Sequence, residues 1–389
     1  MEGRPYGHAT EAAVIEAARA AGVTAPEVLT VLKPEDGIGS GFIMRALPGT
    51  PDPRAIQAMA GADTILREAA RDLARIHSLR REDLPQDVSV MDYREAIADL
   101  RRQFEEAGGD RPIVALGLKW MEDHCPDPCP PVLNHGDYRL GNILCADGHL
   151  TGVLDWELVH FGDPHEDLAF GCMAVWRFAR YDRPALGLGS LESYFAAYEA
   201  ESGRRVDRAR FRYWMIHRTV WWALGCLKCA RTWREGADRM LERVVISRRT
   251  SENELDLLML LEEDAPAAER ARPLPPAPAV RVSVGEATQG EIATAIAEWL
   301  ETVKHRMEGH DRFQIAVARN ALGMIAREAE TSAVAEDAAL ARALLAGERS
   351  LAEPGLLALL RRGALDKLAA DVPKYPALAV ARRQWTGED

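Results

Sequence analysis

An acidic residue and an amide stand five positions apart in the short polar segment 135–142, HGDYRLGN. The segment lies between the apolar runs PPVL and ILCA, and a second carboxylate, Asp155, follows in LTGVLDW. Phosphoryl transfer from ATP needs one carboxylate to orient or deprotonate the acceptor hydroxyl. It also needs an amide and another carboxylate to hold Mg²⁺ against the phosphates. The spacing therefore predicts Asp137 in the first role, and Asn142 and Asp155 as metal ligands.

A β-hairpin is expected to bring these groups together. Asp147-Gly148 stands between the apolar runs NILCA and LTGVLDW, and Asp-Gly in such a place is a signal for a tight hairpin turn. The hairpin would return Asp155 to the side of Asp137 and Asn142.

The elements before this segment can also be predicted. Residues 10–22, TEAAVIEAARAAG, are typical of a helix with Thr10 as N-cap and Gly22 at the C-terminal stop. EVLTVL and GFIMRAL indicate two short strands. TILREAARDLARIHSL predicts a long amphipathic helix, whose apolar face would carry Ile65, Ala69, Leu73 and Ile76.

The motif HGDYRLGN…LDWE, with the GDPHEDLAF that follows it, resembles the aminoglycoside phosphotransferase family. Members of this family are relatives of protein kinases and phosphorylate small-molecule hydroxyls, and the likeness runs from about Thr10 to Leu260. It implies a kinase-like fold, ATP and Mg²⁺ as cofactors, and the same roles for Asp137, Asn142 and Asp155. HGDYRLGN is similar to a subgroup found beside acyl-CoA dehydrogenases, for which a hydroxyacyl-CoA substrate is the expectation.

Four side chains are expected to support the loop. Arg139 stands where related protein kinases carry a Lys that contacts the γ-phosphate, so it could stabilise charge on the transferring group; a solvated loop arginine is the alternative. His135 should brace the loop by hydrogen bonds. Asp167 should cap backbone amides, and His77 should be a helix-face histidine with satisfied hydrogen bonds.

The resemblance also implies parts that this sequence does not supply. Related enzymes hold ATP with a Gly-rich strand-turn-strand, a Lys on the third strand and a Glu on the next helix. Glu11 stands at the position of that Glu, but MEGRPYGHA is too short for three strands and has no Lys. Either the working enzyme begins upstream and this chain is impaired, which we favour because the base and metal ligands are intact, or the chain is a non-catalytic nucleotide- or acyl-CoA-binding pseudokinase.

The sequence also suggests where adenine binds and what charge the acceptor carries. The resemblance implies that adenine meets the backbone of Arg45, Ala46 and Leu47. Between residues 177 and 234 basic residues outnumber acidic ones, which suits an anionic acceptor better than a polycationic one. The arginines concerned are Arg177, Arg180, Arg204, Arg205 and Arg218, although a solvated helix face would have the same composition.

The bulk properties exclude several classes of protein. A formal charge of −12 and a pI of about 5.4 argue against non-specific binding to nucleic acid or to an anionic membrane. The N-terminus has no apolar signal segment and no uncharged run is long enough to span a membrane, so we expect a cytoplasmic protein. The close cysteine pairs CPDPC and CLKC do not favour zinc, because one lies in a Pro-rich loop and the other in a helical run.

The chain length of 389 residues predicts more than one domain. We expect an α+β, protein-kinase-like two-lobe fold with a truncated N-lobe, a mostly helical C-lobe and a C-terminal all-α domain. The expected boundaries are a partial N-lobe at 1–47, a C-lobe at 48–264, a Pro/Ala-rich linker at 265–283 and a small helical domain at 284–389. RFQIAVARNALGMIAREAE resembles a helical domain of unknown function that often follows this kinase type, and oligomerisation through it is one hypothesis.

Overall fold

The computed structural model describes residues 6–276, 286–330 and 337–387. The chain divides into two compact units. Unit 1 consists of Met1–Ala96 and His124–Arg218, and unit 2 of Ile97–Asp123 and Thr219–Asp389. Helices α4 (Tyr93–Glu106) and α8 (Arg208–Arg234) begin in unit 1 and continue into unit 2. This α+β architecture, mostly helical with short sheets, is the predicted fold class.

Unit 1 opens with helix α1 (His8–Ala20), which buries Ala12, Val14, Ile15 and Ala18. Its N-cap is Gly7, three residues before the predicted Thr10. The prediction that Thr10 caps the helix was therefore wrong. Its hydroxyl donates a 2.6 Å hydrogen bond to Asp87 and so joins α1 to a distant loop. Gly22 has a φ of 86°, which suits the predicted C-terminal stop.

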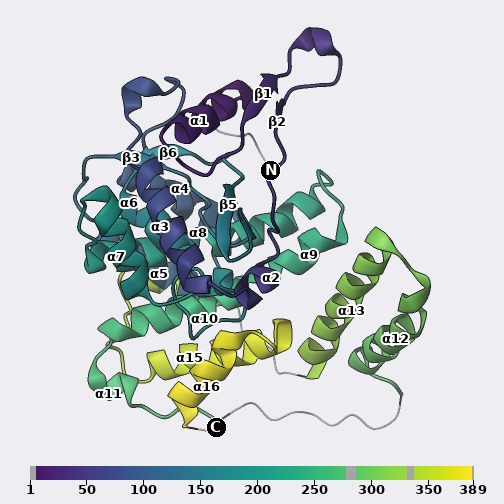
Figure 1. Ribbon diagram of the computed structural model, residues 1–389. Helices are drawn as coiled ribbons and strands as arrows, with labels where there is room; N and C mark the ends of the chain where they lie inside the picture. Colours follow the sequence, from purple (N-terminus) through teal and green to yellow (C-terminus); the bar gives the residue numbers. More distant parts are fainter. Residues whose placement is uncertain (1–5, 277–285, 331–336, 388–389) are drawn as a thin grey trace. The chain divides into compact units, whose positions relative to one another are not determined.

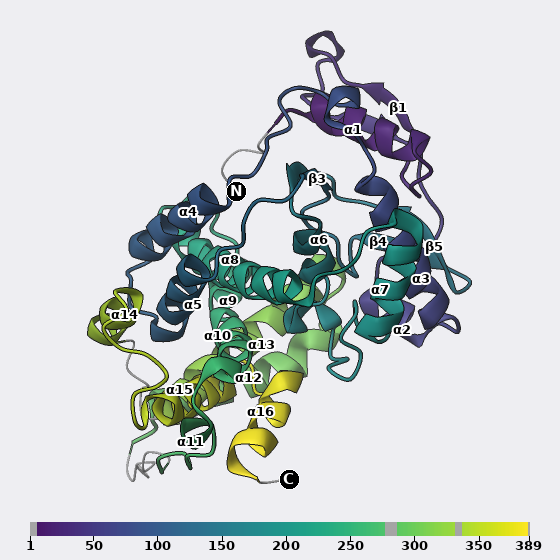
Figure 2. The same ribbon diagram turned by 90° about the vertical axis from the view of Figure 1, so that its left-hand side faces the viewer.

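The two predicted strands of the N-terminal region are present. Strands β1 (Val28–Val31) and β2 (Phe42–Met44) form an antiparallel two-stranded sheet. Helix α1 lies beside β1 in both views (Figures 1 and 2). Leu29, Ile43 and Met44 remain about half exposed, and among the described residues no third strand extends this ribbon.

Two further strand pairs frame the loop 135–142. Strand β3 (Val132–Asn134) pairs antiparallel with β6 (His160–Gly162), and β4 (Ile143–Ala146) pairs antiparallel with β5 (His149–Val153). The turn between β4 and β5 is the predicted Asp147-Gly148, with φ of 51° and 80°. Positive φ at both residues is the geometry that a two-residue hairpin needs.

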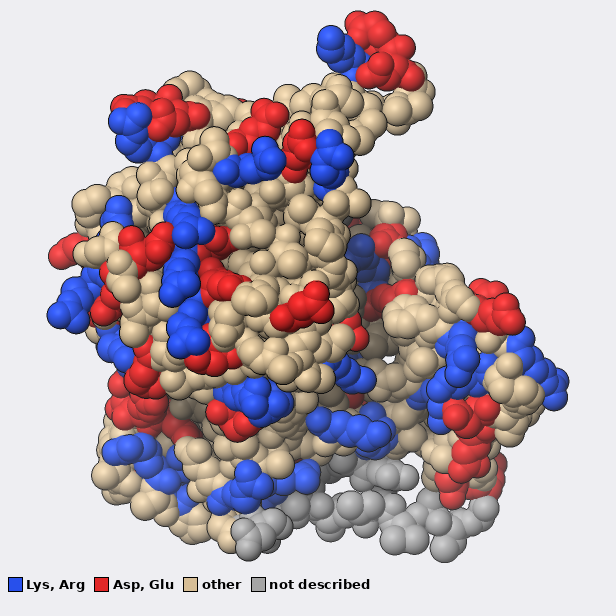
Figure 3. Space-filling view, viewed as in Figure 1, with Lys and Arg blue, Asp and Glu red and all other residues tan. Residues whose placement is uncertain are grey.

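The helices of unit 1 pack around these strands: α2 (Pro53–Ala58), α3 (Ala62–Ile76), α6 (Pro164–Phe170) and α7 (Leu191–Ser202). Helices α3 and α7 lie side by side in both views (Figures 1 and 2). The predicted apolar face of α3 is buried in full. Its opposite face carries a row of basic side chains, visible in Figure 3, that includes Arg67, Arg71 and Arg75.

Unit 2 is helical. Besides parts of α4 and α8 it contains α5 (Pro112–Asp123), α9 (Leu241–Ser247), α10 (Thr250–Leu261), α11 (Ala267–Arg270), α12 (Gln289–Val303), α13 (Gly309–Glu330), α14 (Ala338–Leu345), α15 (Leu356–Asp371) and α16 (Pro376–Thr386). Helix α14 packs on α5, and α15 and α16 pack on α10. No helix among the described residues is long and apolar enough to cross a membrane.

The packing of unit 2 bears on the predicted domain boundaries. Buried ion pairs join elements on both sides of the predicted linker; Arg361 of α15, for example, donates 2.8 Å to Glu262. Helix α11 lies inside the predicted linker 265–283, and residues 277–283 of that linker fall outside the described residues. The four-part division stays a prediction.

Candidate active site

The loop after β3 is held by a buried carboxylate on α6. Asp167 accepts hydrogen bonds from the backbone N–H groups of His135, at 2.5 Å, and Gly136, at 2.8 Å. Its Oδ2 also lies 3.3 Å from His77 Nε2. Burial opposes ionisation of Asp167, but its interaction with His77 and the hydrogen bond from the Gly136 backbone lower its pKa. The predicted capping role of Asp167 and the satisfied His77 are both confirmed.

Gly136 allows the chain to turn sharply at the start of this loop. Its φ is 84°, and a Cβ at this position would lie 2.4 Å from the carbonyl oxygen of Leu158. Only glycine fits both the left-handed backbone and this close approach. Steric limits therefore explain why the motif has glycine at position 136.

His135 braces the loop, as predicted. The Asp137 N–H donates 3.3 Å to His135 Nδ1, and His135 Nε2 lies 3.1 Å from the Leu154 carbonyl oxygen. This pattern requires the neutral ring with its proton on Nε2. Burial lowers the pKa of His135 and so favours the same neutral form. The side chain thus ties the loop to the strand that leads to Asp155.

Three of the predicted site residues converge directly. Asn142 Nδ2 donates 2.6 Å to Asp137 Oδ2 and 3.0 Å to the Asp137 carbonyl oxygen. Arg139 Nε donates 2.8 Å to Asp137 Oδ1, and Arg139 Nη2 donates 3.2 Å to Asp137 Oδ2. The Arg139 guanidinium also lies 4.4 Å from the centre of the Trp176 ring. Arg139 is therefore an ion-pair partner of the carboxylate in this structure, and not a solvated loop arginine.

The hairpin places Asp155 next to this cluster. Ile143 pairs with Val153, and one residue further the Leu154 N–H donates 2.8 Å to the Asn142 carbonyl oxygen. Asp155 follows immediately, with a φ of 65° and an exposed side chain. This left-handed backbone lies two residues after the end of β5 at Val153.

The environment of Asp137 changes the acidity of its carboxyl group. Burial raises the pKa of Asp137, while the charge and hydrogen bond of Arg139 partly oppose that rise. A carboxyl group with a raised pKa holds its proton more readily than a free aspartate does. The side chain is 16% exposed, so it remains accessible to a substrate.

The predicted nucleotide contacts lie in the N-terminal part of unit 1. Glu11 is buried in α1. The Arg45 N–H donates 2.8 Å to the Glu27 carbonyl oxygen and the Arg45 side chain pairs with Glu27, so that N–H is not available to adenine. Ala46 is exposed, and Leu47 packs against Gly152 of β5. The roles of Glu11, Arg45, Ala46 and Leu47 stay predictions.

Two residues that sequence reasoning missed support the hairpin and the loop. The Tyr6 hydroxyl donates 2.5 Å to the Trp156 carbonyl oxygen and accepts from the Val159 N–H at 2.8 Å. Trp176 provides the ring beneath Arg139. Neither residue lies in a motif. Each contact joins residues that are far apart in the chain, so no local signal in the sequence predicts it.

A buried polar cluster behind β3 was also not predicted. Asn134 Nδ2 donates 3.0 Å to the Asp163 carbonyl oxygen, and Glu166 lies beside His160 and Arg218. Burial opposes ionisation of Glu166, but the charges of Arg218 and His160 lower its pKa.

The arginines proposed for the acceptor do not gather into one site. Arg218 is buried against Glu166, so the expectation that it meets an acceptor is wrong. Arg180 pairs with Asp182, and Arg177 donates to the Cys172 carbonyl oxygen. Arg205 is almost fully exposed beside Glu199, and Arg204 is exposed.

No group of three or more His, Cys, Asp or Glu residues is arranged as a metal site among the described residues. Asn142 and Asp155 offer one amide and one carboxylate oxygen. Mg²⁺ commonly takes one or two protein ligands and completes its octahedron with water and phosphate oxygens. The two residues therefore fit the predicted metal by donor type.

Comparison with known proteins shows which family this chain matches. Residues 8–210 match the model of the phosphotransferase enzyme family. The chain is 30% identical over 219 residues to acyl-CoA dehydrogenase family member 10 of Mus musculus, covering 50% of the chain and 20% of that protein. It is 28% identical over 196 residues to acyl-CoA dehydrogenase family member 11 of Gallus gallus, covering 47% of the chain and 24% of that protein. The chain thus spans only a fifth to a quarter of these relatives.

A solved structure supports the fold. A candidate aminoglycoside phosphotransferase from Ralstonia eutropha superposes with a TM-score of 0.55 at 20% identity, over 66% of this chain and 83% of that one. At this identity the likeness concerns the fold alone. With the family match over more than half of its length, the chain belongs to the phosphotransferase enzyme family.

Proposed function

We propose that this protein is an ATP-dependent phosphotransferase that acts on the hydroxyl group of a small molecule. One observation carries the proposal: Asn142 bonds to the Asp137 carboxylate while the β4–β5 hairpin sets Asp155 beside Asn142. A base, an amide and a second carboxylate in this order are what phosphoryl transfer requires.

Asp137 acts on the acceptor in this proposal. Its carboxylate orients the acceptor hydroxyl and takes up the proton as the oxygen bonds to the γ-phosphorus and the bond to the leaving ADP breaks. Burial raises the pKa of Asp137, which suits proton uptake. Asn142 fixes the carboxylate through the 2.6 Å hydrogen bond.

The metal would be held by Asn142 and Asp155. The Asn142 amide nitrogen is engaged by Asp137, which leaves its oxygen as the ligand atom. The Asp155 carboxylate is exposed and can supply a second oxygen. Bound Mg²⁺ would neutralise charge on the phosphates.

Arg139 would assist the same transfer. Its guanidinium pairs with Asp137 here, and a γ-phosphoryl group placed near Asp137 would offer it a second anionic partner. A guanidinium shared between them would stabilise charge on the transferring group.

The acceptor class is proposed from the relatives. The matched proteins are named as acyl-CoA dehydrogenase family members, which favours a hydroxyacyl-CoA as acceptor. We place the protein in the cytoplasm, acting on small molecules and not on nucleic acid or membranes.

We also propose that this chain, assayed alone, turns over slowly. Among the described residues, neither β1 nor β2 carries a lysine. Phosphoryl transfer depends on positioning and charge stabilisation, and a strand lysine on the phosphates would contribute to both. A non-catalytic nucleotide- or acyl-CoA-binding module is the alternative.

The test is ADP formation by the 389-residue chain with Mg-ATP and a panel of hydroxyacyl-CoA esters, with binding measured separately by titration. We expect weak Mg-ATP binding and slow, acceptor-dependent turnover, and the Asp137→Asn variant should lower that turnover by about 10²–10⁴-fold without changing ATP binding. Binding without acceptor-dependent turnover would favour the non-catalytic module. Fast Asp137-dependent turnover would show that a lysine on β1 or β2 is not needed for the rate.

A further inference from the structure

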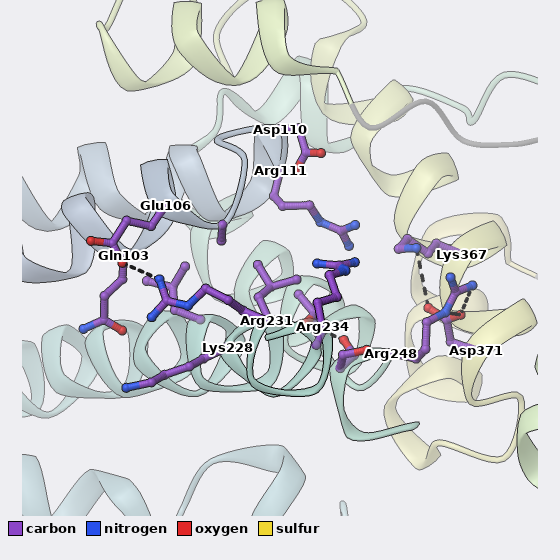
Figure 4. Close-up of a pocket in the computed structure, with 16 residues that line it drawn as sticks. Gln103, Glu106, Asp110, Arg111, Lys228, Arg231, Arg234, Arg248, Lys367 and Asp371 are labelled. Carbon is purple, nitrogen blue, oxygen red and sulfur yellow. Dashed lines mark hydrogen bonds and ion pairs between the residues drawn. The ribbon is translucent and has the colours of Figure 1, made fainter. Parts of the chain in front are cut away.

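Unit 2 contains a cavity of about 250 Å³ that plays no part in the site described above. Its wall comes from the end of α4 and the α4–α5 connection, the second half of α8, the α9–α10 junction and the end of α15 (Figure 4). All of these segments belong to the same compact unit.

The charge of the wall is opposite to that of the protein. Three carboxylates, Glu106, Asp110 and Asp371, line the cavity together with six cationic side chains. The six are Arg111, Lys228, Arg231, Arg234, Arg248 and Lys367. In a chain of formal charge −12, an excess of positive charge around one hollow creates a local field that attracts anions.

Most of these cations are held in place by carboxylates. Arg231 pairs with Glu106 at 2.6 Å, and Arg248 reaches Asp371 at 2.6 Å. Arg111 is buried and makes a two-pronged contact with the buried Glu254 outside the cavity. The ion pairs therefore fix the shape of the wall.

Arg234 differs from the others. Within the described part of the chain its side chain has no hydrogen-bond or ion-pair partner, and it is exposed at the cavity. Arg111 and Arg234 point toward one another in Figure 4, from the α4–α5 connection and from α8. Arg111 is already paired with Glu254, so an anion that enters the cavity would find its free guanidinium partner in Arg234.

We propose that this cavity binds the phosphate or diphosphate group of a small metabolite, with Arg234 and Lys228 as the principal contacts. Guanidinium groups match phosphate oxygens through paired hydrogen bonds, and an ammonium adds a point charge. Pockets for drug-sized ligands have volumes of roughly 300–1,000 Å³. A cavity of about 250 Å³ thus suits a phosphate group with a short organic part and not a whole nucleotide.

The proposal is tested by calorimetric titration of the 389-residue chain with inorganic pyrophosphate, in buffer with EDTA so that magnesium does not link the probe to Asn142 and Asp155. We expect saturable binding of one equivalent. The double variant Lys228→Ala/Arg234→Ala should bind at least about tenfold more weakly, because charge-assisted hydrogen bonds to phosphate are lost. Arg234→Lys should keep part of the affinity for pyrophosphate, since lysine retains the positive charge but cannot form the paired hydrogen bonds of a guanidinium.

Two controls make the result specific. Lys374→Ala/Arg383→Ala removes one lysine and one arginine from exposed positions that do not line the cavity, and it should bind as the parent does. Asp155→Asn should also leave pyrophosphate binding unchanged, so the outcome does not depend on the proposed phosphotransfer. Absence of saturable binding, an equal loss in the control double variant, or loss of binding in Asp155→Asn would each overturn the proposal. Circular dichroism should confirm that every variant is folded.

Discussion

At the scale of single residues, the ion pair of Asp137 and Arg139 governs the acidity of the carboxyl group at the candidate site. Burial raises the pKa of Asp137 and the arginine charge pulls it down again, so the two effects oppose each other. Neither effect can be removed without changing the protonation of the carboxyl group at a given pH.

We predict that Arg139→Gln raises the pKa of Asp137 further, because the guanidinium charge no longer favours the carboxylate. The acid limb of the pH–rate profile should move to higher pH. The carboxyl carbon resonance of Asp137 should titrate at higher pH, which can be measured even where turnover is slow. Arg67→Gln, on the outer face of α3, removes an equal charge and should leave both unchanged. A shift to lower pH in Arg139→Gln would contradict the prediction.

At the scale of elements, helix α6 holds the loop through Asp167. This buried carboxylate accepts two backbone N–H groups and faces His77. The loop geometry that orients Asp137 therefore depends on a residue about thirty positions further along the chain.

We predict that Asp167→Ala lowers the free energy of unfolding by about 3 kcal/mol or more, since each buried donor left without an acceptor costs about 1–3 kcal/mol. Urea unfolding at pH 7 measures this difference. A loss below about 1 kcal/mol would mean that water or another acceptor replaces the carboxylate.

The same carboxylate predicts a pH dependence of stability. Its folded pKa lies below the value in the unfolded chain, which is about 3.9 for Asp. Its contribution is therefore present above about pH 4 and is lost as the pH falls through the folded pKa. Urea unfolding of the parent chain should weaken more steeply below about pH 4 than that of Asp167→Asn. Parallel curves for the two proteins would refute this assignment.

The start of the loop offers a steric test at the same scale. Gly136 and Gly203 both have a positive φ, but only at Gly136 would a Cβ meet a backbone oxygen, at 2.4 Å; at Gly203 nothing lies within 4 Å. Gly203→Ala should cost about 1–2 kcal/mol, the usual penalty of the left-handed conformation. Gly136→Ala should cost clearly more, measured by urea unfolding. Equal losses would show that the loop relaxes around the new methyl group.

At the scale of the whole molecule, unit 2 joins segments from both sides of the predicted linker. Most of the leucines of α14, α15 and α16 are buried, and these helices pack on α5 and α10. The Arg361–Glu262 ion pair, with both side chains 4% exposed, crosses the same contact.

We predict that a chain ending at Pro276 is strongly destabilised or insoluble, because it exposes the apolar faces of α5 and α10 and leaves Glu262 without Arg361. Replacing only residues 286–330, helices α12 and α13, by a short Gly/Ser linker should cost less. Thermal and urea unfolding of the three chains give the comparison. Should the chain ending at Pro276 match the full chain in stability, residues 284–389 form an independent domain as the sequence predicted.

The sequence by itself determined the elements and the motif. The alternation of apolar runs around Asp147-Gly148 predicted the hairpin, and local turn chemistry is strong enough to fix such a structure without help from distant contacts. The motif spacing predicted that Asp137 and Asn142 lie together, and the hydrogen bond between their side chains agrees with it; the convergence of the Asp155 carboxylate with them stays a prediction. The loop bracing by His135 and the capping by Asp167 followed from the motif as well.

Only the tertiary structure decided where isolated polar side chains find partners. Thr10 donates a hydrogen bond to Asp87 and does not cap the helix, Arg218 forms an ion pair with Glu166, and the Tyr6 hydroxyl donates to the Trp156 carbonyl oxygen. The packing of α14–α16 on α5 and α10 was equally invisible in the sequence. Helical periodicity shows that a face is buried but not against which element, because partners far apart in the chain are selected by the shape and charge of the folded surfaces.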